Sequence, residues 1–202
     1  MYEYEQALWD KGLLLCGVDE AGRGPLAGDV YAAAVILPVG VEIEGVNDSK
    51  KLTPKKREKL FDLIQEKSAA WSIATATVEE IDRLNILQAT FLAMRRAVEG
   101  LSIQPDMILV DGNRAPEIPG EAPIHTLVGG DAKSASIAAA SILAKVARDR
   151  YMEKLALEYP EYLFEKHKGY GTKLHYEMLR DYGVSPVHRK TFLKSFYKQQ
   201  SL

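Results

Sequence analysis

The sequence has little of what several protein classes require. It contains a single cysteine, Cys16, so no internal disulfide can form, and a reducing compartment is expected. No apolar run approaches the length of a membrane span, and the first residues do not combine a basic start, an apolar stretch and a cleavage site. We therefore expect a cytoplasmic protein that has no membrane as a partner.

Several catalytic patterns are also missing. The four histidines are scattered along the sequence and match no zinc template, and Cys16 has no partner spacing typical of a thiol nucleophile. The serine-rich stretch 134–142 lacks the strained G-x-S-x-G setting of a hydrolase, and no G-x-x-x-x-G-K-[ST] phosphate loop occurs. These absences argue against covalent catalysis and against a zinc centre.

The 202 residues are 47% hydrophobic, which is enough for one substantial core and predicts a single domain over 1–202. The net charge is only −2, but residues 166–202 hold eight basic against two acidic residues, a local charge of +6. Aromatic residues lie among these basic ones, which favours a nucleic-acid partner. A solvated helical surface is the commoner explanation of a lone charge cluster, and that alternative stays open at this point.

The order of apolar runs and capping signals predicts an α/β fold around one mixed sheet. The first two strands should be antiparallel neighbours joined by a glycine loop. Thr53 followed by Pro54 predicts the start of the first long helix. A basic helical segment should occupy about 162–202. The predicted strands are 13–18, 30–38, 71–78, 106–113 and 124–131, and further helices are expected over 79–99 and 134–159.

Acidic side chains follow three of these strands: Asp19 and Glu20, then Asp111, then Asp131. One such aspartate is more often a turn or capping residue, but coincidence explains three strand ends poorly. Strand ends converge on one crevice in an open α/β sheet. Because adjacent residues of a strand face opposite sides, we expect the first strand to stop at the acidic pair. Four carboxylates in one crevice would repel one another unless a hard divalent cation such as Mg²⁺ joined them.

The loop after the acidic pair reads AGRGP. Its glycines let the backbone approach a ligand closely, and Arg23 offers a fork of donors to phosphate. A G-R-G triplet alone is usually only a turn. Beside two carboxylates it becomes a credible binding site for sugar and phosphate together.

Six motifs make the sequence similar to bacterial ribonuclease HII. From about Leu14 to Phe192, they occur in that family's order: GVDEAGRGPLAG, NDSKKLT, LVDGN, SIAAASILAKVARDR, HKGYGT and PVHRKTF. The resemblance implies a ribonuclease H-like fold, a five-stranded mixed sheet flanked by helices. It also implies cleavage of the RNA strand of RNA–DNA hybrids and nicking of duplex DNA 5′ to embedded ribonucleotides, with a role in ribonucleotide excision repair and RNA primer removal.

The resemblance also implies roles for individual residues. The family's metal-binding carboxylates fall on Asp19, Glu20, Asp111 and Asp131, which would hold two Mg²⁺ or Mn²⁺ ions in the active complex. Two such ions would activate water for attack on the phosphodiester and stabilise the departing 3′ oxygen, leaving 3′-hydroxyl and 5′-phosphate ends. A monomer is expected.

Substrate-binding residues follow from the same resemblance. The motif that senses the ribose 2′-OH falls on Gly22, Arg23 and Gly24, and the 2′-OH is what distinguishes RNA from DNA. The family's tyrosine near the sugar of the scissile junction falls on Tyr170. Without the flanking HKG and GT residues, a core tyrosine beside a turn would be the better interpretation of Tyr170. Lys50 matches a lysine near the backbone phosphates.

Two positions depart from the family pattern. Asp29 stands where proline is common, and Gly129 stands where lysine is frequent, so one adds a negative charge near the site and the other removes a positive one. Two rival functions also remain. A phosphate-handling ATPase or sugar kinase would need a second domain and another phosphate loop. A non-catalytic binding module for hybrids would not need four strand-end acids, which repel phosphates unless metal is present.

Overall fold

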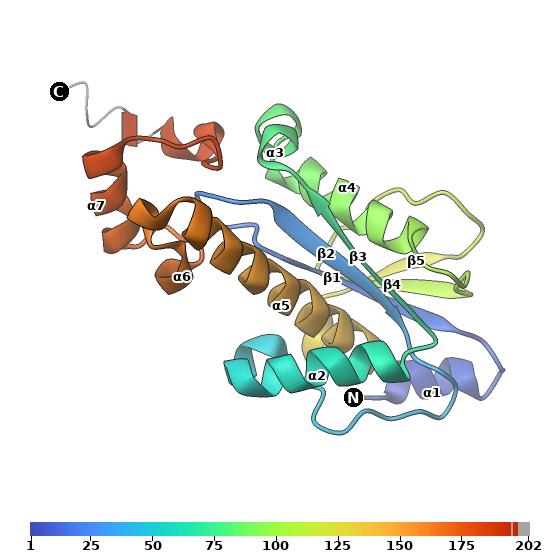
Figure 1. The fold of residues 1–202 in the computed structure, drawn as a ribbon. Helices are drawn as coiled ribbons and strands as arrows, with labels where there is room; N and C mark the ends of the chain where they lie inside the picture. Colours follow the sequence, from blue (N-terminus) through green and yellow to red (C-terminus); the bar gives the residue numbers. More distant parts are fainter. Residues whose placement is uncertain (195, 198–202) are drawn as a thin grey trace.

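A five-stranded sheet forms the centre of the computed structural model, which describes residues 1–194, 196 and 197 (Figure 1). The strand order is β3-β2-β1-β4-β5. β1 is antiparallel to β2 and β2 to β3, whereas β4 runs parallel to β1 and β5 parallel to β4. The strands are β1 (Leu15–Ala21), β2 (Val30–Ile36), β3 (Ala70–Ala76), β4 (Met107–Asp111) and β5 (Ile124–Leu127). The predicted five-stranded mixed sheet and the antiparallel first pair are confirmed.

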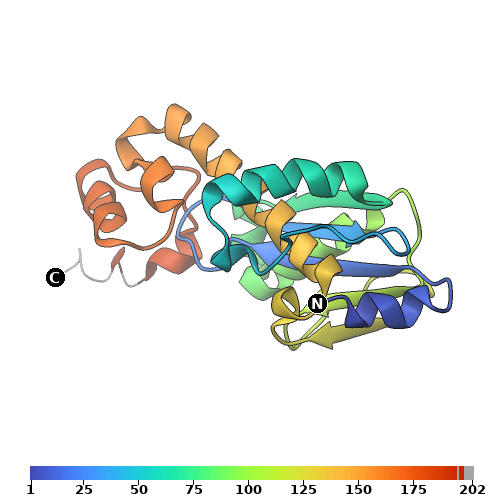
Figure 2. The ribbon, with the colours of Figure 1, turned by 90° about the horizontal axis from the view of Figure 1, so that it is seen from below.

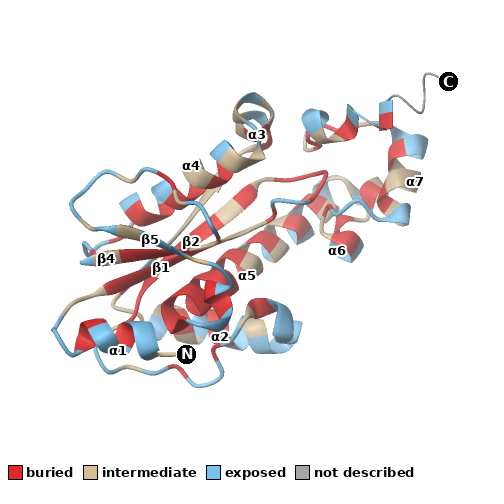
Figure 3. Cartoon of the chain, turned by 180° about the vertical axis from the view of Figure 1, so that it is seen from behind, coloured by how far each residue is buried: buried red, intermediate tan, exposed pale blue. Residues whose placement is uncertain are grey.

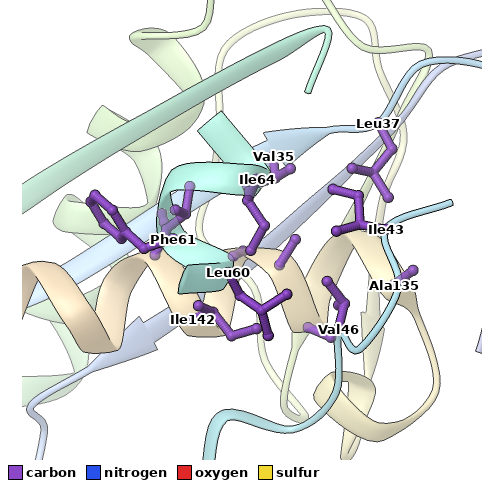
Figure 4. Close-up of a cluster of buried hydrophobic side chains, with 14 of the residues drawn as sticks. Val35, Leu37, Ile43, Val46, Leu60, Phe61, Ile64, Ala135 and Ile142 are labelled. Atoms are coloured by element: carbon purple, nitrogen blue, oxygen red, sulfur yellow. The ribbon is translucent and has the colours of Figure 1, made fainter. Parts of the chain in front are cut away.

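Helices cover both faces of this sheet (Figures 1 and 2). Alternate residues of β2 enter two different cores: Ala33 and Val35 pack with α2 and α5, and Ala32 and Ala34 pack with α4. Figure 4 shows the first of these cores, where side chains of α2 and α5 meet those of β2. The helices are α1 (Glu3–Trp9), α2 (Pro54–Lys67), α3 (Val78–Leu84), α4 (Ile86–Glu99), α5 (Ala135–Glu158), α6 (Phe164–His167) and α7 (Lys173–Tyr182).

The long helix α5 lies unusually close to the sheet because small residues meet at the contact. A Cβ atom added to Gly17 of β1 would lie 2.2 Å from the backbone carbon of Ser136, so only glycine fits there. Ser134 begins the helix, since its hydroxyl accepts a hydrogen bond from the Ile137 amide at 3.3 Å. In Figure 3, β1, β4 and the sheet-facing side of α5 are buried, and the outer side of α2 is exposed.

The predicted start of the first long helix is confirmed. The Thr53 hydroxyl accepts a hydrogen bond from the Lys56 amide at 3.3 Å, and Pro54 is the first residue of α2. The prediction of a single helix over 79–99 was wrong, because this segment forms two helices, α3 and α4, separated by Asn85. Asn85 has a φ of 73°, and its side chain accepts hydrogen bonds from the first amides of α4. The short helix α1 was not predicted.

The C-terminal part of the chain forms a small helical lobe beyond one end of the sheet, reached by the end of α5 (Figures 1 and 2). It contains α6, α7 and the short 3₁₀ turns η3 (Pro160–Tyr162) and η4 (Lys190–Leu193). Leu26 and Ala27 of the glycine loop pack into its core with Met152, Phe164 and Leu179. Of the basic segment predicted over 162–202, Ser195 and 198–202 lie outside the described residues. No helix in the part of the chain described here is both long and apolar enough to cross a bilayer.

Candidate active site

β1 and β4 bring two of the predicted acids to the same face of the sheet. Leu15 of β1 and Leu109 of β4 belong to one buried cluster with Ile137 of α5. Because side chains alternate along a strand, Asp19 and Asp111 project to this α5 side as well. Asp19 is 6% exposed and Asp111, the last residue of β4, is partly exposed.

The prediction that the first strand stops at the acidic pair was wrong. β1 stays paired with β2 through Ala21, because the antiparallel ladder continues beyond Glu20. The break occurs on the other edge of the strand, where pairing with β4 ends at Val18. Asp19 and Glu20 therefore have no ladder partner on the β4 side, although the strand itself continues to Ala21.

Asp131 reaches the same region from a turn and not from a strand end, which corrects the predicted strand over 124–131. β5 ends at Leu127, and the 3₁₀ turn η2 (Gly130–Ala132) holds Asp131 just before α5. The Gly130 amide donates to Asp111 Oδ1 at 2.6 Å, so the turn is tied to the end of β4. This hydrogen bond places two of the predicted acids on adjoining segments.

The acids repel one another in their shared, partly dry environment. Burial raises the pKa of Asp19 well above its usual range, and the negative charges of Glu20, Asp111 and Asp131 raise it further. Burial also raises the pKa of Glu20, against the opposing effect of Arg23. The four predicted carboxylates therefore repel one another, and this repulsion favours the binding of a cation among them.

Two protein cations border the acids, and both were among the predicted site residues. Arg23 Nη1 lies 3.3 Å from Glu20 Oε1, and Lys50 Nζ lies 3.7 Å from Asp131 Oδ2. The Arg23 side chain is 50% exposed and that of Lys50 83% exposed, so each pair contributes little stability. Both side chains are consequently free to exchange these acids for other anions.

The donor set fits a hard divalent cation. It consists of carboxylate oxygens that repel each other, which are the ligands Mg²⁺ and Mn²⁺ prefer. Among the described residues, no three Asp, Glu, His or Cys side chains are already arranged around one point for a metal. The contacts explain this, because Glu20 turns toward Arg23, Asp131 toward Lys50, and Asp111 toward a backbone amide. Ion binding would have to turn these side chains inward.

The glycine loop and Tyr170 lie next to each other at this edge. Gly22 follows β1 with a φ of +96°, a backbone conformation that favours glycine. A Cβ atom added to Gly24 would lie 3.7 Å from Tyr170 Cε1, so the tyrosine ring covers that glycine. Tyr170 is 44% exposed and is therefore a surface residue rather than a core one.

The two departures from the family pattern have different surroundings. Asp29 Oδ1 accepts a hydrogen bond from the Val78 amide at 3.0 Å at the start of α3, so its carboxylate is directed to that helix. Burial raises the pKa of the Asp29 carboxyl. Gly129 has a φ of +64° and open space around it, so a side chain there would meet backbone strain but no steric contact.

Some residues near the site were not predicted. Asp48 adds to the charge at Asp131, whose pKa is raised first by burial and then by the Asp48 charge. Asp48 could have been predicted as a site residue, because it lies two residues before Lys50 in the NDSKKLT motif. Three histidines that are scattered in the sequence, His167, His175 and His188, are packed together in the C-terminal lobe.

Comparison with known proteins gives a consistent result. The family model described as Ribonuclease HII matches residues 16–199. A curated Ribonuclease HII from Caldicellulosiruptor saccharolyticus is 54% identical over 198 residues, which are 98% of this chain and 96% of the relative. The crystal structure of the ribonuclease H2 from Pyrococcus horikoshii OT3 matches with a TM-score of 0.77 and 31% identity, over 93% of this chain and 98% of that one. Bst-RNase HIII in complex with Mn²⁺ matches with a TM-score of 0.64 and 19% identity, over 88% of this chain and 66% of that one, a likeness of fold.

Proposed function

The chain belongs to the ribonuclease HII family and is a metal-dependent nuclease of the ribonuclease H type, and on this premise we propose how it acts and on what. Its substrates are RNA–DNA hybrids, whose RNA strand it cuts internally, and duplex DNA with embedded ribonucleotides, which it nicks on the 5′ side of the ribonucleotide. The products are a 3′-hydroxyl and a 5′-phosphate. In the cell this activity would serve ribonucleotide excision repair and the removal of RNA primers.

One observation supports this proposal more than any other. Asp19, which follows the last residue of β1 paired with β4, is close enough to Glu20, Asp111 and Asp131 for their charges to raise its pKa. Glu20 also contacts Arg23 of the glycine loop that follows β1. Such a cluster of carboxylates is repulsive by itself and would reject a phosphate backbone. It becomes useful for phosphodiester hydrolysis once divalent cations join acid and phosphate.

We assign the metal ligands within this cluster. Asp19 and Asp111, which share one face of the sheet, would be the central ligands, and Glu20 and Asp131 would complete the sites of two Mg²⁺ or Mn²⁺ ions. When bound, the ions supply activation of the attacking water and neutralisation of the charge on the phosphate. Lys50, released from Asp131, would contact a backbone phosphate.

Selectivity for RNA needs a separate device, because the phosphates of the two nucleic acids are alike. Backbone groups of Gly22, Arg23 and Gly24 would recognise the ribose 2′-OH, since the two glycines have no side chain to keep the sugar away. Tyr170, exposed over Gly24, would pack against the neighbouring deoxyribose. This arrangement would favour cleavage at an RNA-to-DNA junction.

The C-terminal lobe would extend the contact along the duplex. Its basic residues would bind phosphates without regard to sequence, so binding should weaken as salt increases. The whole chain would act as one catalytic domain, with about 162–202 as its nucleic-acid-binding segment. The monomeric state and the cytoplasmic setting stay predictions.

The test is cleavage of an RNA–DNA hybrid labelled at the RNA 5′ end, with Mg²⁺, with Mn²⁺ and with EDTA. We expect internal cuts with either metal, none with EDTA, and none in an all-DNA duplex of the same sequence. A protein that binds the hybrid tightly yet cuts it with neither metal would support the binding-module function instead. Nucleotide hydrolysis in the absence of nucleic acid would support the ATPase or kinase function.

A further inference from the structure

Two buried arginines lie behind the glycine loop with almost no access to solvent. Arg189, from the PVHRKTF motif, is 0% exposed, and Arg148, from α5, is 1% exposed. No ion pair between residues that the structure describes includes either guanidinium. Charged groups buried in this way are costly unless hydrogen bonds compensate them.

Backbone carbonyls of the loop provide that compensation. Arg189 donates from Nε to the Gly28 carbonyl at 2.8 Å, from Nη1 to the Arg23 and Pro25 carbonyls at 2.9 and 2.8 Å, and from Nη2 to the Gly22 carbonyl at 2.6 Å. One face of the guanidinium lies on Phe192, with 5.2 Å between Cζ and the ring centroid. A single side chain therefore holds four carbonyls of one short loop.

Arg148 fixes the remainder of the same loop. It donates to the carbonyls of Ala27 and Asp29, at 3.1 and 3.2 Å, and to that of Lys168 at 3.1 Å. A Cβ atom added to Gly22 would lie 2.0 Å from Arg148 Nε, so the arginine fills the space that a side chain would need. Arg148 thus anchors the loop to α5 and to the HKGYGT segment.

This arrangement determines where the loop amides point. In a trans peptide the carbonyl of one residue and the N–H of the next are directed oppositely. Because the Gly22 and Arg23 carbonyls point inward to Arg189, the Arg23 and Gly24 amides point outward. Neither amide donates a hydrogen bond to another residue within 1–194, 196 and 197, whereas the nearby Leu26 amide donates to the Gly169 carbonyl at 2.7 Å.

From these contacts we propose that Arg189 is a positioning residue for ribose selectivity. It holds the Gly22 and Arg23 carbonyls inward and so presents the Arg23 and Gly24 amides, beside Tyr170, as two fixed donors to a ribose 2′-oxygen. The inference rests on the proposed function, since it assumes that this loop recognises the ribose. It assigns the selectivity of the loop to a residue far away in the sequence, buried and out of contact with the substrate.

The test compares Arg189→Lys with Arg95→Lys. Lysine keeps the positive charge but has three donors on one nitrogen, so it cannot hold four carbonyls in the geometry of the planar guanidinium. Arg95 is exposed on α4, where its ion pair with Glu99 accepts a lysine equally well. The readout is the affinity, in Ca²⁺ to prevent cleavage, for a duplex with one ribonucleotide and for the same duplex in all-DNA form.

We expect the ratio of the two affinities to fall at least tenfold in Arg189→Lys, while all-DNA binding and the circular dichroism spectrum stay as in wild type and Arg95→Lys keeps the full ratio. Arg189→Lys that is folded and keeps the wild-type ratio overturns the inference. Equal loss of affinity for both duplexes also overturns it, because that result indicates a merely structural role.

A second measurement uses the wild type alone and is independent of the fold of any variant. Amide hydrogen exchange at Arg23 and Gly24 should be fast in the free protein and should slow on addition of the ribonucleotide duplex in Ca²⁺, but not on addition of the all-DNA duplex. Slow exchange in the free protein overturns the inference. Failure of the proposed function is distinct from both results, because the wild type itself would then show no preference between the duplexes.

Discussion

The Nε2 atoms of His175 and His188 lie 3.0 Å apart inside the C-terminal lobe, where neither residue is exposed. His175 Nδ1 lies 3.0 Å from the Tyr170 carbonyl, to which it can only donate. His188 Nδ1 accepts from the Ser185 amide at 3.1 Å, so His188 donates through Nε2 and His175 accepts. Both rings are therefore neutral, and this proton order ties the backbone of Tyr170 to the lobe.

Acidification should destabilise this lobe. Burial lowers the pKa of His175 to about 4 and that of His188 to about 3, from an ordinary value of 6.5. The unfolded chain then binds more protons than the folded one, so the stability from each ring is complete above about pH 6.5 and is lost as the pH falls toward the folded pKa. For His175 this amounts to about 3 kcal/mol.

Asp19, Glu20 and Asp131 act in the opposite direction, because the raised pKa values of these three carboxyls favour the folded, metal-free protein at low pH. The histidines are therefore best followed individually by NMR. The ring resonances of His175 and His188 should keep their neutral shifts down to about pH 5. Titration of either ring near its ordinary value would contradict the proton order described above.

Replacing Asp111 by asparagine should abolish cleavage and leave duplex binding intact. The amide keeps the size of the side chain but removes a negative charge from the metal-binding cluster. Loss of several kcal/mol of metal-dependent stabilisation should reduce kcat by roughly 100-fold or more. Asp62→Asn, the same change on the exposed side of α2, is the control and should cleave like the wild type. Normal cleavage by Asp111→Asn would remove this residue from the metal site.

Tyr170 should act through its ring and not through its hydroxyl. The ring is exposed over Gly24, where a deoxyribose can pack on it. Tyr170→Ala should lower kcat/KM on a single-ribonucleotide duplex roughly tenfold, which corresponds to about 1.4 kcal/mol of lost contact. Tyr170→Phe should retain most of the activity. Equal loss in both variants would assign the role to the hydroxyl instead.

Gly22→Ala should destabilise the protein more than Gly40→Ala. Both glycines have positive φ angles, +96° and +73°, so alanine is strained at both positions, and more so at Gly22. Only Gly22 adds a clash, with Arg148 Nε at 2.0 Å, whereas no atom lies within 4 Å of a Cβ at Gly40. Urea unfolding should show an additional loss of about 1–3 kcal/mol for Gly22→Ala. Equal losses would mean that Arg148 moves aside freely.

Local patterns predicted much of the fold. Thr53 with Pro54 marked the start of α2, and the apolar runs identified the five strands, because caps and alternation act over a few residues. The break at Asn85 was missed because the apolar spacing of a helix continues across it. The length of β1 was also missed, because only its partner β2 keeps Glu20 in the ladder.

Some residues of the site could be predicted from local sequence, and others depend on contacts between distant segments. The acids and glycines of the site could be predicted from the sequence, because they directly follow apolar runs that form strands. The role of Arg189 could not be predicted in this way. Its partners are backbone carbonyls of a loop about 160 residues earlier, and every residue has such a carbonyl, so the sequence does not identify them. The contact between His175 and His188 could not be predicted either, because the chain between α7 and η4 brings the two rings together only in the folded protein.

Mapping the nick in a duplex that contains a single ribonucleotide tests the central claim most directly. If the carboxylate cluster directs water to the phosphate and the glycine loop recognises the 2′-OH, one cut should appear on the 5′ side of the ribonucleotide. It should leave a 3′-hydroxyl and a 5′-phosphate, require Mg²⁺ or Mn²⁺, and be absent from the all-DNA duplex. A cut on the 3′ side that leaves a cyclic 2′,3′-phosphate and persists in EDTA would contradict the account, because the 2′-OH would then be the nucleophile.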